Sequence, residues 1–116
     1  MTMYRECLTV DERGERSILE NMPPSRSLCG IARFFAVFSD ETRLKILSAL
    51  SMKDLCVADL CFFLASEQST VSHQLRLLKD AGIVASRKAG RLTLYTIVDP
   101  YVSEVMLTGA RRLRRR

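Results

Sequence analysis

The sequence has no long apolar stretch and no internal repeat. None of its apolar runs approaches 18 residues, which excludes a transmembrane helix. The opening residues, MTMYRECLTV, do not place a charged stretch before an apolar one, so we expect no signal peptide and a cytoplasmic protein. The absence of a repeat at a solenoid period excludes a repeat architecture. At 116 residues, a single folded domain is expected.

The four cysteines form no Cys-x-x-Cys pair, which argues against a zinc ribbon or a redox motif of that type. They are Cys7, Cys29, Cys56 and Cys61. His73 is the only histidine, and we find no Cys–His arrangement with a plausible base for a nucleophilic centre. The Cys-x5-Arg spacing of a phosphate-binding loop occurs only at Cys7, in a glycine-poor segment with no predicted strand before it. The sequence therefore does not predict an enzyme.

The net charge of +5 is unevenly distributed along the chain. Five of the 18 basic residues lie in 111–116, and residues 1–110 carry 13 basic and 13 acidic groups. Within that neutral part, residues 66–98 carry five basic and two acidic groups. This locally positive segment favours contact with nucleic acid, and the arginine-rich end is expected to add salt-dependent, non-specific affinity.

The pattern of residues divides the chain into three parts. Residues 1–24 form a polar arm that ends in two prolines and can hold a short helix over Asp11–Asn21. Residues 25–110 carry the periodic apolar pattern of a folded domain, and residues 111–116 form a basic tail.

Apolar residues at helical spacing predict four consecutive helices from Ser25 onward. The inward positions expected for them are Ile31, Phe34, Phe35 and Phe38; Leu44, Ile46, Leu47 and Leu50; Val57, Leu60 and Leu64; and Val71, Leu75 and Leu78. The pair Ser39-Asp40 is expected to supply the cap of the second of these helices and Ser66 that of the fourth, and Gly82 is expected to end the fourth.

A change of period after Gly82 predicts a β-hairpin and then a last helix. Residues 83–86 and 92–97 are rich in β-branched and aromatic residues, and the basic segment 87–91 between them contains a glycine. Asp99 and Pro100 are expected to open the last helix. The resulting order, α-α-α-α-β-β-α, predicts a mostly α fold with a small hairpin wing, which is a winged helix-turn-helix.

This element order predicts that double-stranded DNA is the partner. The fourth helix buries one face and presents hydrogen-bonding side chains on the other, while the wing presents cations. The expected DNA-binding residues are Gln68, Ser69, Thr70, Ser72, His73, Arg76, Arg87, Lys88 and Arg91. His73 lies between Ser72 and Gln74 on the polar face, so a phosphate or base contact is favoured over metal ligation.

The chain resembles the ArsR/SmtB family of small, dimeric, metal-sensing repressors. The matching runs are FFAVFSDETRLKILSAL (34–50), DLCVADL (54–60), STVSHQLRLLKDAGIV (69–84) and RKAGRLTLYTI (87–97). The resemblance covers residues 25–105 and implies a homodimer built by the first and last helices of the domain. It also implies binding to an inverted-repeat operator and release when an inducer ion binds.

The resemblance further implies two alternative places for the ion. Zinc-sensing relatives use acidic and histidine ligands on the last helix, where this chain keeps Asp99 but has Tyr101, Arg112 and Arg115 at the other positions. Arginine cannot ligate a cation, so we expect this site to be absent.

The second place is the thiolate site of the family, centred on Cys-Val-x-Asp-Leu. Here it corresponds to Cys56 and Asp59, with Cys7 of the partner's arm as an added ligand and Asp11 as a poorer one. Such a donor set selects a soft metal or metalloid ion as inducer: Cd(II), Pb(II), Zn(II) or As(III).

Cys61 is a further candidate ligand, because arsenic-sensing relatives have cysteines at both outer positions of this motif. On an ideal helix, Cys56 and Cys61 would be separated by a rise of ~7.5 Å and a rotation of about 140°, so joint ligation requires Cys56 to precede the helix or the first turn to be distorted. Core packing of Cys61 remains the alternative, as it does for Cys29. A metal-independent repressor that responds to thiol oxidation remains the alternative function.

Overall fold

The computed structural model describes residues 7–114 in two compact units, Met1–Ala32 and Arg33–Arg116, which are treated separately below. In the first unit, α1 (Glu12–Asn21) begins at Asp11, whose carboxylate accepts a hydrogen bond from the Gly14 amide at 2.8 Å. This is the short helix predicted within the arm. The next helix, α2 (Ser25–Ala36), starts directly after Pro24 and continues into the second unit.

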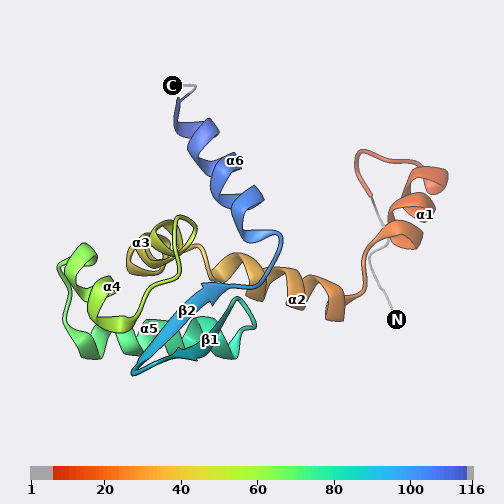
Figure 1. Cartoon of the computed structure of the whole chain (residues 1–116). Helices are drawn as coiled ribbons and strands as arrows, with labels where there is room; N and C mark the ends of the chain where they lie inside the picture. The colour runs from red at the N-terminus through yellow and green to blue at the C-terminus, as the bar shows by residue number, and fades with distance from the viewer. Residues whose placement is uncertain (1–6, 115–116) are drawn as a thin grey trace. The chain divides into compact units, whose positions relative to one another are not determined.

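The second unit is a helical core with a two-stranded hairpin (Figure 1). Its elements after α2 are α3 (Glu41–Leu50), α4 (Val57–Leu64), α5 (Gln68–Asp80), β1 (Val84–Ala89), β2 (Leu92–Ile97) and α6 (Val102–Arg114). The order agrees with the predicted one. Of the predicted pair Ser39-Asp40, it is Asp40 that caps α3, because its side chain accepts from the Arg43 amide at 3.0 Å. None of the described helices has the length and apolarity needed to cross a membrane.

The core forms where α3, α4, α5 and the hairpin meet. Half of the predicted inward positions are buried there: Ile46, Leu47, Leu50, Leu60, Val71, Leu75 and Leu78. Phe34 and Phe38 pack partly against this core, whereas Phe35 and Ile31, expected on the same stripe, are exposed. Each core side chain is apolar, and burying such side chains is the main source of stability for a domain of this size.

The turn between α4 and α5 differs from the sequence prediction. The backbone amides of Ala65 and Ser66 donate to Phe62 and Cys61 carbonyls, and the Ser66 hydroxyl donates to the Leu64 carbonyl at 3.3 Å. Ser66 therefore helps to close α4, and Glu67 occupies the cap position of α5. Ala65 provides the sharp change of direction in a left-handed conformation, with φ of 52°.

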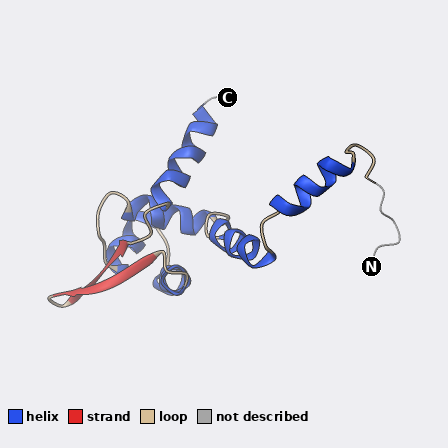
Figure 2. Cartoon of the chain, turned by 90° about the vertical axis from the view of Figure 1, so that its right-hand side faces the viewer, coloured by secondary structure: helices blue, strands red, loops and turns tan. Residues whose placement is uncertain are grey.

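The hairpin, called the wing below, is longer and has a tighter turn than predicted. Ala89 pairs with Leu92, so only Gly90 and Arg91 form the turn, and Arg87 and Lys88 belong to β1. Gly90 has φ of 66°, a conformation that is favourable only without a Cβ. Figure 2 shows this hairpin extending outward from the helices of its unit.

The last helix begins two residues later than predicted and continues into the basic end. Asp99 accepts a hydrogen bond from the Tyr101 amide at 2.8 Å, which forms a turn before α6 starts at Val102. Helix α6 runs through Arg111 and Arg112 to Arg114, and all three arginines are exposed.

Two neighbouring residues of α4 provide a test of this core. Leu60 is 0% exposed, so Leu60→Ala should lower the free energy of unfolding by about 2–5 kcal/mol because it removes buried apolar surface and leaves a cavity. Phe62 is 80% exposed and contacts Phe63 edge to face, so Phe62→Ala should cost about 1 kcal/mol or less. Urea unfolding followed by circular dichroism measures both. Equal losses would contradict the described burial of α4.

Candidate DNA interface and thiolate site

One face of α5 is fixed by burial, and the opposite face carries the predicted DNA-binding residues. Val71, Leu75 and Leu78 are at most 1% exposed. The six predicted residues of this helix are all exposed: Gln68, Ser69, Thr70, Ser72, His73 and Arg76. The first three lie in the first turn, where free backbone amides also point outward. This surface can donate and accept hydrogen bonds and is suited to phosphates and base edges.

Arg43 of α3 links α5 to the end of α2. Its Nη1 donates to Gln74 Oε1 at 3.0 Å, and its Nε and Nη2 donate to the carbonyls of Val37 and Ala36 at 3.0 and 3.1 Å. A planar guanidinium can satisfy three such acceptors at once, which a lysine ammonium at this position cannot do with the same geometry. Arg43 therefore fixes α5 relative to the preceding helices.

The wing is tied to the rest of its unit by polar side-chain contacts on β1. Lys79 at the end of α5 donates to the Ser86 hydroxyl at 2.8 Å. On the same strand, Arg87 Nη2 lies 3.2 Å from Asp54 Oδ2 in an ion pair. The three predicted wing cations, Arg87, Lys88 and Arg91, are all exposed.

The wing contacts of Asp54 lower the pKa of its carboxyl group. A hydrogen bond from the Thr96 side chain, and next the one from Arg87, holds the pKa of Asp54 below its usual value. Asp54 lies at the end of the α3–α4 connection and thus contacts β1 through Arg87 and β2 through Thr96.

Cys56 lies at the start of α4, two residues after Asp54. Cys56 is 7% exposed, has extended backbone angles and occupies the cap position, with its carbonyl accepting from the Leu60 amide. The preceding residue, Leu55, exchanges two backbone hydrogen bonds with Tyr95 of β2, at 2.8 and 3.3 Å. Cys56 therefore precedes the helix, which is the condition set by the sequence for joint ligation with Cys61.

The other predicted ligands occupy different environments. Asp59 is exposed in the first turn of α4, at the position whose side chain faces the cap residue. Cys61 is half-buried and packs against the core. Cys7 belongs to the first unit, where its exposed thiol lies 3.6 Å from Glu15 Oε1, and Cys29 on α2 is also exposed.

Among residues 7–114, no three His, Cys, Asp or Glu side chains are grouped closely enough to hold a metal ion. Ligation by Cys56 and Asp59 therefore stays a prediction, and a complete site would need a further donor. At the last helix, Tyr101 and Arg112 are exposed, and Arg115 lies outside the described residues.

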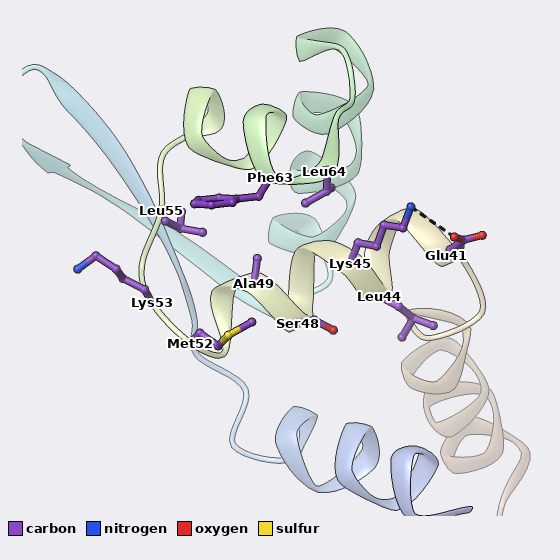
Figure 3. A pocket seen from close by; sticks show the side chains of 10 residues that line it. All are labelled: Glu41, Leu44, Lys45, Ser48, Ala49, Met52, Lys53, Leu55, Phe63 and Leu64. Atoms are coloured by element: carbon purple, nitrogen blue, oxygen red, sulfur yellow. Dashed lines mark ion pairs between the residues drawn. The ribbon is translucent and has the colours of Figure 1, made fainter. Parts of the chain in front are cut away.

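An apolar groove of about 640 Å³ lies between α3 and α4 (Figure 3). Phe63 and Leu64 of α4 face Ala49 of α3 across it, and an ion pair of 3.4 Å between Lys45 and Glu41 borders it. None of the predicted DNA-binding or ligand residues lines this groove.

Comparison with known proteins gives the family. The profile described as "Bacterial regulatory protein, arsR family" matches residues 40–86. The antimony-specific transcriptional repressor AntR, a solved structure, matches with a TM-score of 0.75 at 30% identity over 82% of this chain and 86% of its own. The chain belongs to the ArsR/SmtB family. As the sequence predicted, this is a family of DNA-binding transcriptional regulators and not of enzymes.

Two curated relatives are transcriptional regulators, and one of them is named for cadmium resistance. A cadmium resistance transcriptional regulatory protein CadC homolog of Staphylococcus aureus is 42% identical over 77 residues, which is 66% of this chain and 64% of that protein. A transcriptional repressor SmtB homolog of Synechocystis sp. is 40% identical over 72 residues, 62% of this chain and 54% of that protein. The match thus spans between half and two thirds of each relative's length.

Sequence reasoning did not identify Arg43 or Asp54. Arg43 lies in the α3 helix 31 residues before its partner Gln74, and Asp54 lies 33 residues before Arg87. The sequence shows which residues can form hydrogen bonds or ion pairs, but tertiary packing determines which of them pair with each other. The only local signal was the position of Asp54 two residues before the cysteine of the thiolate motif.

Replacing Arg43 tests the link between α2, α3 and α5. Arg43→Lys should lower the free energy of unfolding by about 1–3 kcal/mol, because a lysine cannot serve all three acceptors. Arg76→Lys, the same exchange at an exposed position of α5, should change it by about 0.5 kcal/mol or less. Urea unfolding measures the difference, and equal effects of the two variants would refute a linking role for Arg43.

Proposed function

We propose that this chain is a dimeric transcriptional repressor that binds an inverted-repeat operator and leaves it when a soft metal or metalloid ion binds cysteine thiolates. The proposal combines the family, the exposed polar face of α5 with the cationic wing, and the buried Cys56 next to the wing attachment. The last of these observations carries the regulatory part, because it joins the candidate ion site to a DNA-contacting element.

The DNA-binding role is supported by the distribution of chemistry on α5 and the wing. A helix inserted into the major groove reads bases with side chains near its N-terminus, which here are Gln68, Ser69 and Thr70. His73 and Arg76 continue the same exposed face one and two turns later. The cations of the wing then lie along the phosphate backbone or a minor groove.

A homodimer is supported by apolar side chains that remain exposed on α2 and α6. On α2 these are Leu28, Ile31 and Phe35, which are 44–55% exposed, and on α6 they are Leu107 and Leu113. Clustered exposed apolar side chains on a helix favour association with another surface. A second copy of the chain would cover them and would pair two recognition helices with two half-sites about 34 Å apart.

The ion-sensing role is supported by donor chemistry and by the relatives. Thiolates select soft ions such as Cd(II), Pb(II), Zn(II) and As(III), and two relatives are named for cadmium and antimony. In the proposed site, Cys56 and Asp59 hold the ion from one chain, and Cys7 of a partner's arm completes the set. Cys61 is the remaining candidate ligand.

Removing one wing cation tests the DNA-binding role. Lys88→Ala should weaken operator affinity and reduce the slope of log K against log salt by about 0.9 for each phosphate that the protein no longer neutralises, or about 2 for a dimer. Fluorescence anisotropy with a labelled operator at several salt concentrations measures this. Lys45→Ala removes the same charge from the exposed side of α3 and should leave the slope unchanged. Identical slopes for all three proteins would exclude a phosphate contact by Lys88.

Titration with ions tests the sensing role. Cd(II), Pb(II), Zn(II) or As(III) should weaken operator affinity of the wild-type chain by about 5- to 150-fold, the usual range of allosteric coupling. Cys56→Ser should abolish the response because it removes the central thiolate, whereas Cys29→Ser should keep it. Sulfur-to-metal charge-transfer absorbance reports ion binding independently of DNA.

The result can also point to the alternative function. Loss of affinity on treatment with peroxide, without ion uptake, would support a thiol-redox repressor in place of an ion sensor. A wild-type response that persists in both Cys56→Ser and Cys7→Ser would rule out the proposed thiolate site.

A further inference from the structure

The ion pair between Asp54 and Arg87 joins the connection before α4 to a residue expected to contact DNA. Its N–O distance is 3.2 Å, and the Arg87 and Asp54 side chains are 57% and 34% exposed. Arg87 has five N–H donors, so a single bond to Asp54 leaves donors available for a phosphate. An isolated surface arginine would sample many rotamers, and this bond restricts them.

We propose that Asp54 is a positioning residue for DNA binding, whose carboxylate orients the Arg87 guanidinium on the wing toward the phosphate backbone. This inference rests on the proposed operator binding but not on ion sensing. It assigns a favourable role to an acidic residue beside DNA, where its charge alone would repel phosphates.

The surroundings of Asp54 suit such a role because they fix its backbone in place. The neighbouring residue Leu55 is fixed to Tyr95 of β2 by two backbone hydrogen bonds, and the Thr96 side chain lowers the pKa of the Asp54 carboxyl. Asp54 is therefore attached to the strand opposite Arg87. An oriented arginine loses less conformational entropy when it binds a phosphate than a free one does.

Simple electrostatics and positioning give opposite expectations for Asp54→Ala. If Asp54 only offset the positive charge of the wing, its removal would tighten DNA binding. If it positions Arg87, removal should weaken operator binding by about threefold for each wing and by about tenfold for a dimer, within the range of exposed ion pairs.

The experiment is a double-mutant cycle in ion-free protein, read by operator anisotropy over a range of salt concentrations. We expect Asp54→Ala and Arg87→Ala to reduce affinity and salt slope alike, and Asp54→Ala to add nothing when Arg87 is already alanine. Asp54→Glu, which keeps the carboxylate, should restore most of the affinity. Asp80→Ala, the same charge change at the exposed end of α5, should not reproduce the loss.

Three results would overturn the inference. The first is unchanged or tighter operator binding by Asp54→Ala. The others are a loss of affinity from Asp54→Ala that is as large in the Arg87→Ala background as in the wild type, and a loss in Asp80→Ala as large as that in Asp54→Ala. Thermal unfolding of each variant checks its folding, and Asp54→Asn, which retains the size of the side chain, replaces Asp54→Ala if the latter does not fold. A wild-type chain that binds no DNA would overturn the proposed function together with this inference. A failure of ion-induced release would leave the cycle unaffected.

Discussion

Burial of one side of α5 is the constraint on which the rest of the second unit depends. Val71, Leu75 and Leu78 are almost fully enclosed, and a helix held along one line of side chains cannot rotate about its axis without exposing them. This burial dictates that the opposite side, from Gln68 to Arg76, faces solvent. The hydrogen-bonding surface is therefore a direct consequence of core packing. Arg43 of α3 adds a polar contact to the same helix, because it donates a hydrogen bond to the partly buried Gln74.

A short segment, residues 54–56, contacts both strands of the wing and begins α4. Asp54 pairs with β1, Leu55 with β2, and Cys56 opens α4. A displacement of this segment would affect both strands of the wing and the first turn of the helix that leads into α5. Among the described residues, these contacts connect both strands of the wing to the backbone next to Cys56, and the proposed coupling between ion and DNA would act through this segment.

The sequence predicted the elements well because helix and strand periods are local properties. The spacing of Leu60, Val71 and Leu75 is sufficient to identify their inward faces, and Gly82 marks a helix end by its conformational freedom. Ser66 was assigned the wrong role because a hydroxyl between two helices can serve either one, and here it bonds back to Leu64. Contacts of Arg43 and Asp54 were not predictable, since residues 31 and 33 positions apart are joined only by tertiary structure.

The placement of Cys56 shows how backbone geometry alters the chemistry of a motif. Read as part of a continuous helix, Cys56 and Cys61 would point in different directions. As the cap residue, Cys56 has an extended backbone, so its side chain is not restricted to the helical arrangement and lies at the turn that carries Asp59. Cys61 packs against the core, so in the proposed site Cys56 and Asp59 are the donors that this turn would supply. If an ion bound there weakens DNA binding, thermodynamic linkage requires that DNA weaken ion binding by the same factor, so the route through residues 54–56 must act in both directions.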